Sequence, residues 1–285
     1  MRVLAEFIMR GRMQACLVGV FGSLLPFVSV STIGLVTLRK GAAEGFIVSL
    51  WVILPLLLSY MFSASSPFMA VVSGVALINM ALVANAHRVT ADWNFSLGIA
   101  TLSGVVLVCL AALLFQAEMN DFVNELEEML ATASEQSGQT MLVLTRNGFL
   151  AFVAWVVIFN TVIGLVLSRW WQALLYNPGG FQEEFHMLRL SPKLSLVCLS
   201  IFIAGLALGG NYHLWLRLAS IPLLIGGLAI VHYVVQHKGF GRQVLVVMYV
   251  GLFLFGPVLM VLLGALGAAD SVMNFRTRLA DDKQS

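Results

Sequence analysis

Few side chains of this protein could do chemistry, and two of the polar ones lie inside long apolar stretches. Asn79 and Asn160 each fall near the middle of such a stretch, where a buried amide without a partner costs free energy. We expect them to hydrogen-bond to each other, to a backbone group or to a bound ligand. A structural bond within the protein is the more common outcome, and a ligand-binding role is the functional alternative.

The histidines and cysteines do not form a recognisable metal site. His232 and His237 are five residues apart, which sets them roughly 140° apart around a helix of 3.6 residues per turn. They therefore do not share the face that two metal ligands need, and no HExxH motif accompanies them. Cys16, Cys109 and Cys198 lie in apolar stretches without CxxC spacing, so we interpret them as packing residues. We expect neither a metal nor a cofactor.

Nothing in the sequence is typical of an enzyme. It has no GxSxG motif, no cysteine beside a histidine, no paired catalytic carboxylates and no Walker-type phosphate loop. We therefore expect no catalytic residue, and any ATP-driven step would require a partner protein. For two acidic residues we expect ion pairs: Glu44 with the Arg-Lys dipeptide that precedes it, and Asp270 with Arg276 or Arg278.

The elements that must position these side chains are membrane-spanning helices. Hydrophobic residues make up 60% of the 285 positions and charged residues 11%, and the mean hydropathy is +0.94. A soluble domain of this composition would expose large apolar surfaces. The net charge of +2 forms no continuous basic face, so we expect membrane lipid and no nucleic acid as a partner. We expect residues 1–285 to form a single integral membrane domain.

Several apolar stretches reach or approach the roughly twenty helical residues that cross the hydrocarbon core of a bilayer. They are Ala42–Ser63, Pro67–Ala86, Trp93–Phe115, Leu144–Trp171, Leu194–Gly209 and Leu214–Val235. Two further stretches, Met13–Leu38 and Val244–Ala269, contain Pro26 and Pro257 near their middles. Because proline removes a backbone hydrogen bond and clashes with the preceding turn, each of these two is either one kinked helix or two half-helices.

Charge indicates how the two interrupted stretches run. No lysine or arginine lies between Arg88 and Arg146, and acidic residues crowd one link there, so that link is predicted outside the cytoplasm. The basic residues on both sides of Met13–Leu38 can then share the cytoplasmic side only if the chain turns back near Leu25–Pro26. We favour the same turn at Pro257, which places the C-terminus in the cytoplasm; a straight last helix would leave it outside.

Two links predict amphipathic helices of their own. In Asn120–Thr132 the apolar residues share one helical face and the acidic residues lie largely off it, which is typical of a helix in the outer interface. In the link after Gly180, Phe181, Phe185 and Leu188 recur at helical spacing and predict a second interfacial helix, on the cytoplasmic side. The predicted fold is therefore all-α, a polytopic transmembrane helix bundle of about eight to ten membrane segments with broken first and last stretches.

Two segments resemble a family of bacterial membrane proteins. The link FQEEFHMLRLSPKLSL places an aromatic and charged residues before a leucine and the proline that opens the next apolar stretch. In the tail LLGALGAADSVMNFRTRL, a glycine-rich helix runs into an aspartate and a Phe-Arg-x-Arg-Leu run; these residues are Gly264, Gly267, Asp270, Phe275, Arg276, Arg278 and Leu279. Together with Pro257 and the segment HYVVQHKG, both patterns are similar to the YybS-like family of uncharacterised bacterial membrane proteins, over the layout of the whole chain.

By fold, that family is similar to the S components of energy-coupling factor transporters. This similarity implies a multi-pass protein of the bacterial cytoplasmic membrane that binds a small organic solute. The solute would occupy a polar-lined cavity open to the outside, with Asn79 or Asn160 in its wall, and a separate ATPase would drive transport. S components meet their coupling subunit through small residues four apart on the first helix, a spacing present in Ala15, Gly19 and Ser23. Packing within the chain is the alternative role of these residues.

The same family is also similar by fold to the cell-shape protein MreD. This similarity implies a non-transporting membrane scaffold for cell-envelope or other partner proteins. A scaffold would have filled helix interfaces and would hold its partners at the cytoplasmic link, where Phe181 and Phe185 would line an exposed, apolar docking groove. The presence of a cavity or of a groove therefore distinguishes the two functions.

Overall fold

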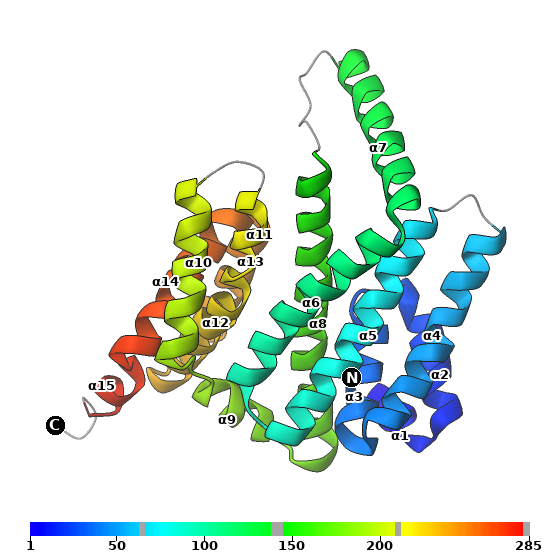
Figure 1. Ribbon diagram of the computed structural model, residues 1–285. Helices are drawn as coiled ribbons and strands as arrows, with labels where there is room; N and C mark the ends of the chain where they lie inside the picture. The colour runs from blue at the N-terminus through cyan, green and yellow to red at the C-terminus, as the bar shows by residue number, and fades with distance from the viewer. Residues whose placement is uncertain (63–65, 138–144, 209–211, 282–285) are drawn as a thin grey trace.

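A computed structural model describes residues 1–62, 66–137, 145–208 and 212–281 of the chain (Figure 1). Within these ranges the chain is helical and has no strand, as predicted. The helices are α1 (Arg2–Arg10), α2 (Arg12–Phe21), the 3-10 helix η1 (Gly22–Leu24), α3 (Val28–Lys40), α4 (Ala42–Phe62), α5 (Pro67–Thr90), α6 (Trp93–Leu114), α7 (Gln116–Ser137), α8 (Arg146–Tyr176), α9 (Gly180–Met187), α10 (Pro192–Leu208), α11 (His213–Arg217), α12 (Ser220–His237), α13 (Gln243–Leu254), α14 (Gly256–Met273) and α15 (Phe275–Asp281).

Five helices of the described residues are long and apolar enough to cross a membrane. They are α5, α6, α8, the segment His213–His237 and α14, and α9 with α10, which meet at an angle of 65°, make a sixth if they form one bent span. α4 and α13 add the shorter apolar segments Ala42–Leu58 and Gln243–Leu254. Because apolar helices of this length match the thickness of a bilayer, they indicate an integral membrane protein.

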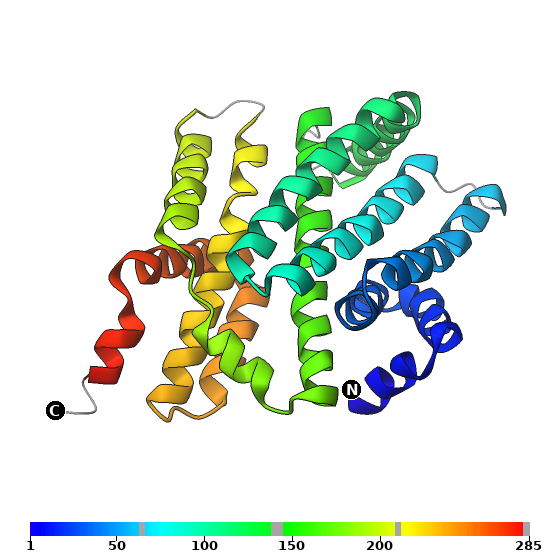
Figure 2. The same cartoon turned by 60° about the horizontal axis from the view of Figure 1, so that its bottom comes forward.

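Two helices are buried along most of their length and organise the bundle. α3 is buried without interruption over residues 29–38, where α2, α4, α5 and α8 surround it. α12 is buried over residues 221–230, chiefly against α14 and α10. Figures 1 and 2 show the helices around α3 and those around α12 as two groups side by side.

The first interrupted stretch forms a hairpin of α2 and α3. The hydroxyl of Ser29 in α3 donates to the carbonyl of Gly19 in α2 over 2.7 Å. Between the two helices, η1 and Phe27, which has a left-handed φ of 64°, reverse the chain. The turn predicted near Leu25–Pro26 is therefore present.

The two ends of this hairpin lie together. Arg12, at the start of α2, donates from Nε to the carboxylate of Glu44 over 2.7 Å, and Glu44 lies in the first turn of α4. The prediction that Glu44 pairs with the preceding Arg-Lys dipeptide missed this partner, because Arg12 comes near Glu44 only when the hairpin folds.

The last interrupted stretch also turns back. α13 returns along α12, with the His232 ring bonded to the Tyr249 hydroxyl over 2.8 Å, and ends just before Pro257 opens α14. α14 then runs in the direction of α12, so that α15 meets the end of α12. There the ring of His237 donates to the carbonyl of Leu279 over 3.0 Å. The end of α15 and the link after α12 therefore lie on the same side, as a turn at Pro257 requires.

Ends of several helices gather at one end of the molecule, which we call the basic end. The guanidinium of Arg39, at the end of α3, lies 4.2 Å from the ring centre of Tyr176, at the end of α8. Arg189, between α9 and α10, lies there too and bonds to the end of α14. α7, which carries the acidic residues of the long link, leaves from the opposite end and projects beyond the other helices (Figure 1).

The two predicted link helices exist, with different extents. α7 is longer than the predicted Asn120–Thr132, and a single residue, Phe115, separates it from α6. Only part of it packs on the bundle: Phe122 lies 5.6 Å from Phe149 between ring centres, and Val123 is fully buried. α9 contains Phe181 and Phe185 as predicted. The interfacial position of both helices stays a prediction.

Candidate functional site

The hairpin of α2 and α3 is shorter than a membrane span, and a cavity lies beyond its tip. α3 has 13 residues, or about 20 Å of helix, against about 30 Å of hydrocarbon core. The tip, residues 24–27, therefore ends between α4, α5 and α8. It leaves a cavity of about 590 Å³, which we call the hairpin cavity.

The hairpin cavity lies in the half of the bundle away from the basic end. Besides the tip, its walls are the second half of α4, the first half of α5 and residues 155–160 of α8. Its volume is in the range of sites for small ligands, which is about 300 to 1,000 Å³. None of the described residues in its walls is charged. Because a buried charge would find no counter-charge there, the cavity suits an uncharged and mostly apolar molecule.

Two polar groups in the wall of the hairpin cavity remain available to a ligand. The three serines of the wall donate to backbone carbonyls, Ser23 to Val20, Ser29 to Gly19 and Ser73 to Met69. The half-buried amide of Asn160 and the indole N–H of Trp155 have no hydrogen bond to other residues of the described ranges. An amide both donates and accepts, so Asn160 can orient a ligand that has a single polar group.

Asn79 is used inside the protein instead. It is fully buried where α5 meets α6 and α8. Its Nδ2 donates to Oγ1 of Thr161 over 2.9 Å, and its Oδ1 accepts from the hydroxyl of Ser103 over 2.6 Å. Asn79 and Asn160 therefore do not bond to each other, and Asn79 has the structural bond that the sequence analysis gave as the more common outcome.

The stripe of small residues on the first helix is mostly covered by the chain itself. Ala15 is buried, and a side chain at Gly19 would collide with Val52, because α2 packs against α4. Ser23 is exposed at the end of this stripe and lines the hairpin cavity. A partner helix would therefore reach Ser23, whereas α4 already occupies the place beside Gly19.

A second cavity, of about 570 Å³, lies between α8, α9, α12 and α13. Phe181 and Phe185 line it, with their ring centres 5.7 Å apart, and Phe185 is only 9% exposed. His186, His232 and Tyr249 line it as well. We call it the aromatic cavity. α9 thus places its two phenylalanines in the wall of this cavity, and little of Phe185 is open to a protein partner.

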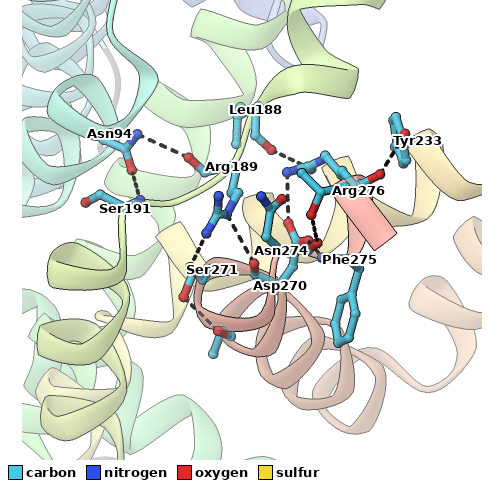
Figure 3. Close-up of polar contacts among 12 residues, drawn as sticks. Asn94, Leu188, Arg189, Ser191, Tyr233, Asp270, Ser271, Asn274, Phe275 and Arg276 are labelled. Atoms are coloured by element: carbon cyan, nitrogen blue, oxygen red, sulfur yellow. Dashed lines mark hydrogen bonds and ion pairs between the residues drawn. The ribbon is translucent and has the colours of Figure 1, made fainter. Parts of the chain in front are cut away.

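The end of α14 is held by charged side chains at the basic end (Figure 3). Arg276 donates to the carboxylate of Asp270 over 2.8 Å and to the carbonyl of Leu188 over 2.7 Å. Arg189 donates to the carbonyls of Asp270 and Ser271, the last turn of α14. This confirms the predicted Asp270–Arg276 pair. Arg276 and Asp270 are only 7% and 2% exposed and form a buried ion pair between α15 and α14. The bond from Arg276 to Leu188 joins α15 to the link before α10.

Asn94, at the start of α6, ties the same link to the helices around α3. Its Nδ2 donates to the carbonyl of Arg189 over 3.2 Å, and its Oδ1 accepts from the backbone N–H of Ser191 over 2.6 Å (Figure 3). One amide side chain therefore satisfies two backbone groups of a segment that has no helix of its own.

Glu184 of α9 forms a second connection between the two groups of helices. Its carboxylate accepts from the indole of Trp93 over 2.8 Å, pairs with Arg169 at 2.6 Å and lies 3.7 Å from the ring of His87. Burial alone would raise the pKa of Glu184, but the neighbouring His87, Arg169 and Trp93 together lower it below its usual value. Glu184 therefore stays ionised and holds α9 against α5, α6 and α8.

The described residues contain no cluster of three or more His, Cys, Asp or Glu side chains that could hold a metal ion. Comparisons with protein-family models, curated proteins and solved structures find no match to this chain. The inference of function therefore rests on the two cavities and on the residues that line them.

The sequence analysis missed several residues of these sites. Ser103 and Thr161 were missed as partners of Asn79, although each is a polar residue within an apolar stretch. Trp155 and Tyr249 were missed as cavity residues, since an aromatic side chain in an apolar helix has no signal that separates a cavity wall from a lipid-facing surface.

Proposed function

We propose that this protein is a multi-pass protein of the bacterial cytoplasmic membrane that binds a small, uncharged organic molecule in the hairpin cavity. The observation that carries the proposal is the amide of Asn160, which bonds to no other described residue and lies in the wall of a cavity of about 590 Å³. An apolar wall with one or two polar groups is the usual composition of a small-molecule site. The apolar wall supplies affinity, and Asn160 with Trp155 supplies orientation.

The position of the cavity supports entry from the side predicted to be outside. The cavity lies away from the basic end, and the positive-inside rule assigns the basic end to the cytoplasm. A ligand would then reach the tip of the α2–α3 hairpin from outside, as in an S component of an energy-coupling factor transporter. We propose this role, and membership of the YybS-like family, with a separate ATPase partner for any transport step.

The proposal is tested by the molecules that co-purify with the protein in lipid nanodiscs, identified by mass spectrometry. Asn160→Leu keeps the size of the side chain and removes its hydrogen bonds. The matched control is Asn124→Leu on the exposed part of α7. We expect a small molecule to be retained by the native protein and by the control, and to be reduced about fivefold in Asn160→Leu, since a hydrogen bond is worth about 1 kcal/mol. Equal retention in all three proteins would show that Asn160 has no role in binding.

The alternative function is a scaffold without transport, as in MreD. The observation that favours it is α7, a 22-residue acidic helix that projects from the bundle and offers a surface to a basic partner. The same purification distinguishes the two functions. Protein partners recovered together with empty hairpin cavities would favour the scaffold, and removal of the α7 charges should then release those partners.

A further inference from the structure

The aromatic cavity has features of a second binding site, separate from the hairpin cavity. Rings form much of its wall, from Trp170 of α8, Phe181, Phe185 and His186 of α9, His232 of α12 and Tyr249 of α13. The rings of Phe181 and Phe185 are nearly parallel, at 28°, whereas Phe185 and His232 meet edge to face, at 87°. Walls of this kind favour a flat ring, because aromatic rings attract one another both face to face with an offset and edge to face.

The same wall offers hydrogen-bond donors without offering charge. None of its described residues is Asp, Glu, Lys or Arg. His232 and Tyr249 share one hydrogen bond of 2.8 Å. If the Tyr249 hydroxyl donates in it, the other ring nitrogen of His232 carries a free N–H; if His232 donates, the Tyr249 O–H is free. Either way the pair keeps one spare donor for a ligand.

His186 supplies a second polar group. Its ring has no hydrogen bond to other residues in the described part of the chain. Burial, and then the positive charge of Arg276, lower the pKa of His186, so its ring is neutral at pH 7 and has one donor and one acceptor. The ring centres of His186 and His232 lie 6.4 Å apart, so the two polar groups are neighbours in the wall of the cavity.

The surroundings of the cavity indicate how a ligand reaches it. α13, which contributes Tyr249, has no buried residue, and Tyr249 itself is 47% exposed. In a membrane such a helix faces lipid, so a molecule dissolved in the bilayer can approach along it. α9 lies at the basic end, where the helices are predicted to return to water, so a polar head would sit near the membrane surface and an apolar tail would extend into the bilayer.

We propose that the aromatic cavity binds a neutral, membrane-soluble molecule with a flat ring and carbonyl oxygens, of the quinone class. The ring would lie among Trp170, Phe181 and Phe185, and its carbonyls would accept from His186 and from the His232–Tyr249 pair. The proposal concerns binding and includes no electron transfer. It does not depend on the hairpin cavity.

The test measures quenching of tryptophan fluorescence by a benzoquinone that carries one short isoprenyl chain, with the protein in nanodiscs and with empty nanodiscs as the reference for partition. Each cavity has its own tryptophan, Trp170 in the aromatic cavity and Trp155 in the hairpin cavity. We expect saturable quenching that persists in Trp155→Phe and is largely lost in Trp170→Phe. Quenching that is lost in Trp155→Phe instead would place the quinone in the hairpin cavity and overturn the proposal.

Two further variants test the hydrogen bonds. His186→Phe, and the double change His232→Phe with Tyr249→Phe, keep the rings and remove the donors, and each should weaken binding about fivefold. The control Tyr212→Phe makes the same chemical change at an exposed residue and should leave binding unchanged. Circular dichroism and size-exclusion chromatography show that each variant is folded.

An isoprenyl chain that lacks the quinone ring tests whether the cavity binds the ring or only an apolar tail. The isoprenyl alcohol of the same length should not displace the quinone. Displacement by this alcohol, or equal affinity in native protein and donor variants, would mean that the cavity holds only an acyl chain, and the proposal would be wrong.

Discussion

Gly227 of α12 and Gly267 of α14 bring the backbones of the two helices into contact. A Cβ at Gly267 would stand 2.6 Å from the amide nitrogen of Gly227, closer than any real side chain allows. In lipid, helices gain little from apolar burial, so this close approach is a main source of their association.

We therefore expect Gly267→Ala to destabilise the protein by about 1 to 3 kcal/mol, since the added methyl group meets backbone that cannot move aside. Gly264→Ala, three residues earlier on the same helix, is the control, because its Cβ would lie 3.7 Å from Leu223, an ordinary contact. Thermal unfolding in detergent should show a lower melting temperature for Gly267→Ala and an unchanged one for Gly264→Ala. Equal melting temperatures for the two variants would contradict the close crossing.

The buried ion pair of Asp270 and Arg276 predicts that two arginines of α15, Arg276 and Arg278, contribute differently to stability. Arg276→Met leaves the Asp270 carboxylate buried without its partner, which costs about 3 to 5 kcal/mol in soluble proteins. Arg278→Met, on the exposed side of α15, should change stability little. The measurement is thermal unfolding, and Asp270→Leu combined with Arg276→Met should recover part of the loss, because no charge then stays unpaired.

The two asparagines should respond differently to the same change. Asn79→Leu removes two buried hydrogen bonds and leaves the hydroxyls of Thr161 and Ser103 with only their backbone carbonyl partners, so we expect a loss of about 1 to 3 kcal/mol. Asn160→Leu should leave the melting temperature nearly unchanged, since no described residue bonds to its amide. A large loss of stability in Asn160→Leu would show that its amide is a structural group.

The hairpin predicts which residues share a side of the membrane. Single cysteines at Arg2 and Lys40, in a chain whose native cysteines are replaced by alanine, should react with a membrane-impermeant thiol reagent from the same side. A cysteine at Asn124 of α7 should react from the opposite side. If the cysteines of Arg2→Cys and Lys40→Cys react from different sides, α2 and α3 do not form a hairpin that begins and ends on one side of the membrane.

Glu184 predicts a dependence of stability on pH. Its pKa is lower in the folded protein than its usual value of about 4.3, so its contribution is fully present above that value and is lost as the pH falls through the lower, folded pKa. The melting temperature of the native protein should therefore fall more steeply below about pH 4 than that of Glu184→Gln. Parallel curves for the two proteins would show that Glu184 does not contribute.

Composition and charge predicted the class of fold and both turns of the chain. The turn near Leu25–Pro26 could be predicted because basic residues on both sides of the stretch had to share one side. Pair contacts between distant segments could not be predicted in this way. Arg12 meets Glu44 only because the hairpin brings the start of α2 to the start of α4.

The site was predicted in part. The sequence identified both asparagines as polar groups in apolar stretches, but it could not separate their roles. That separation depends on direction around a helix: Thr161 faces Asn79, and Asn160, one residue earlier and about 100° away around α8, faces the cavity. Which side of α8 is filled by neighbouring helices is a property of the packed bundle.

The exposure of α13 has a consequence for how the protein would loosen. Each longer apolar helix in the described part of the chain contributes buried side chains, whereas the shorter α13 contributes none and is joined to α12 by the His232–Tyr249 bond. Its departure would uncover little core, because it packs there only through half-buried side chains such as Met248 and Leu252. Among these helices α13 should therefore detach first. The lipid composition of the membrane would then determine how readily lipid enters the rest of the bundle.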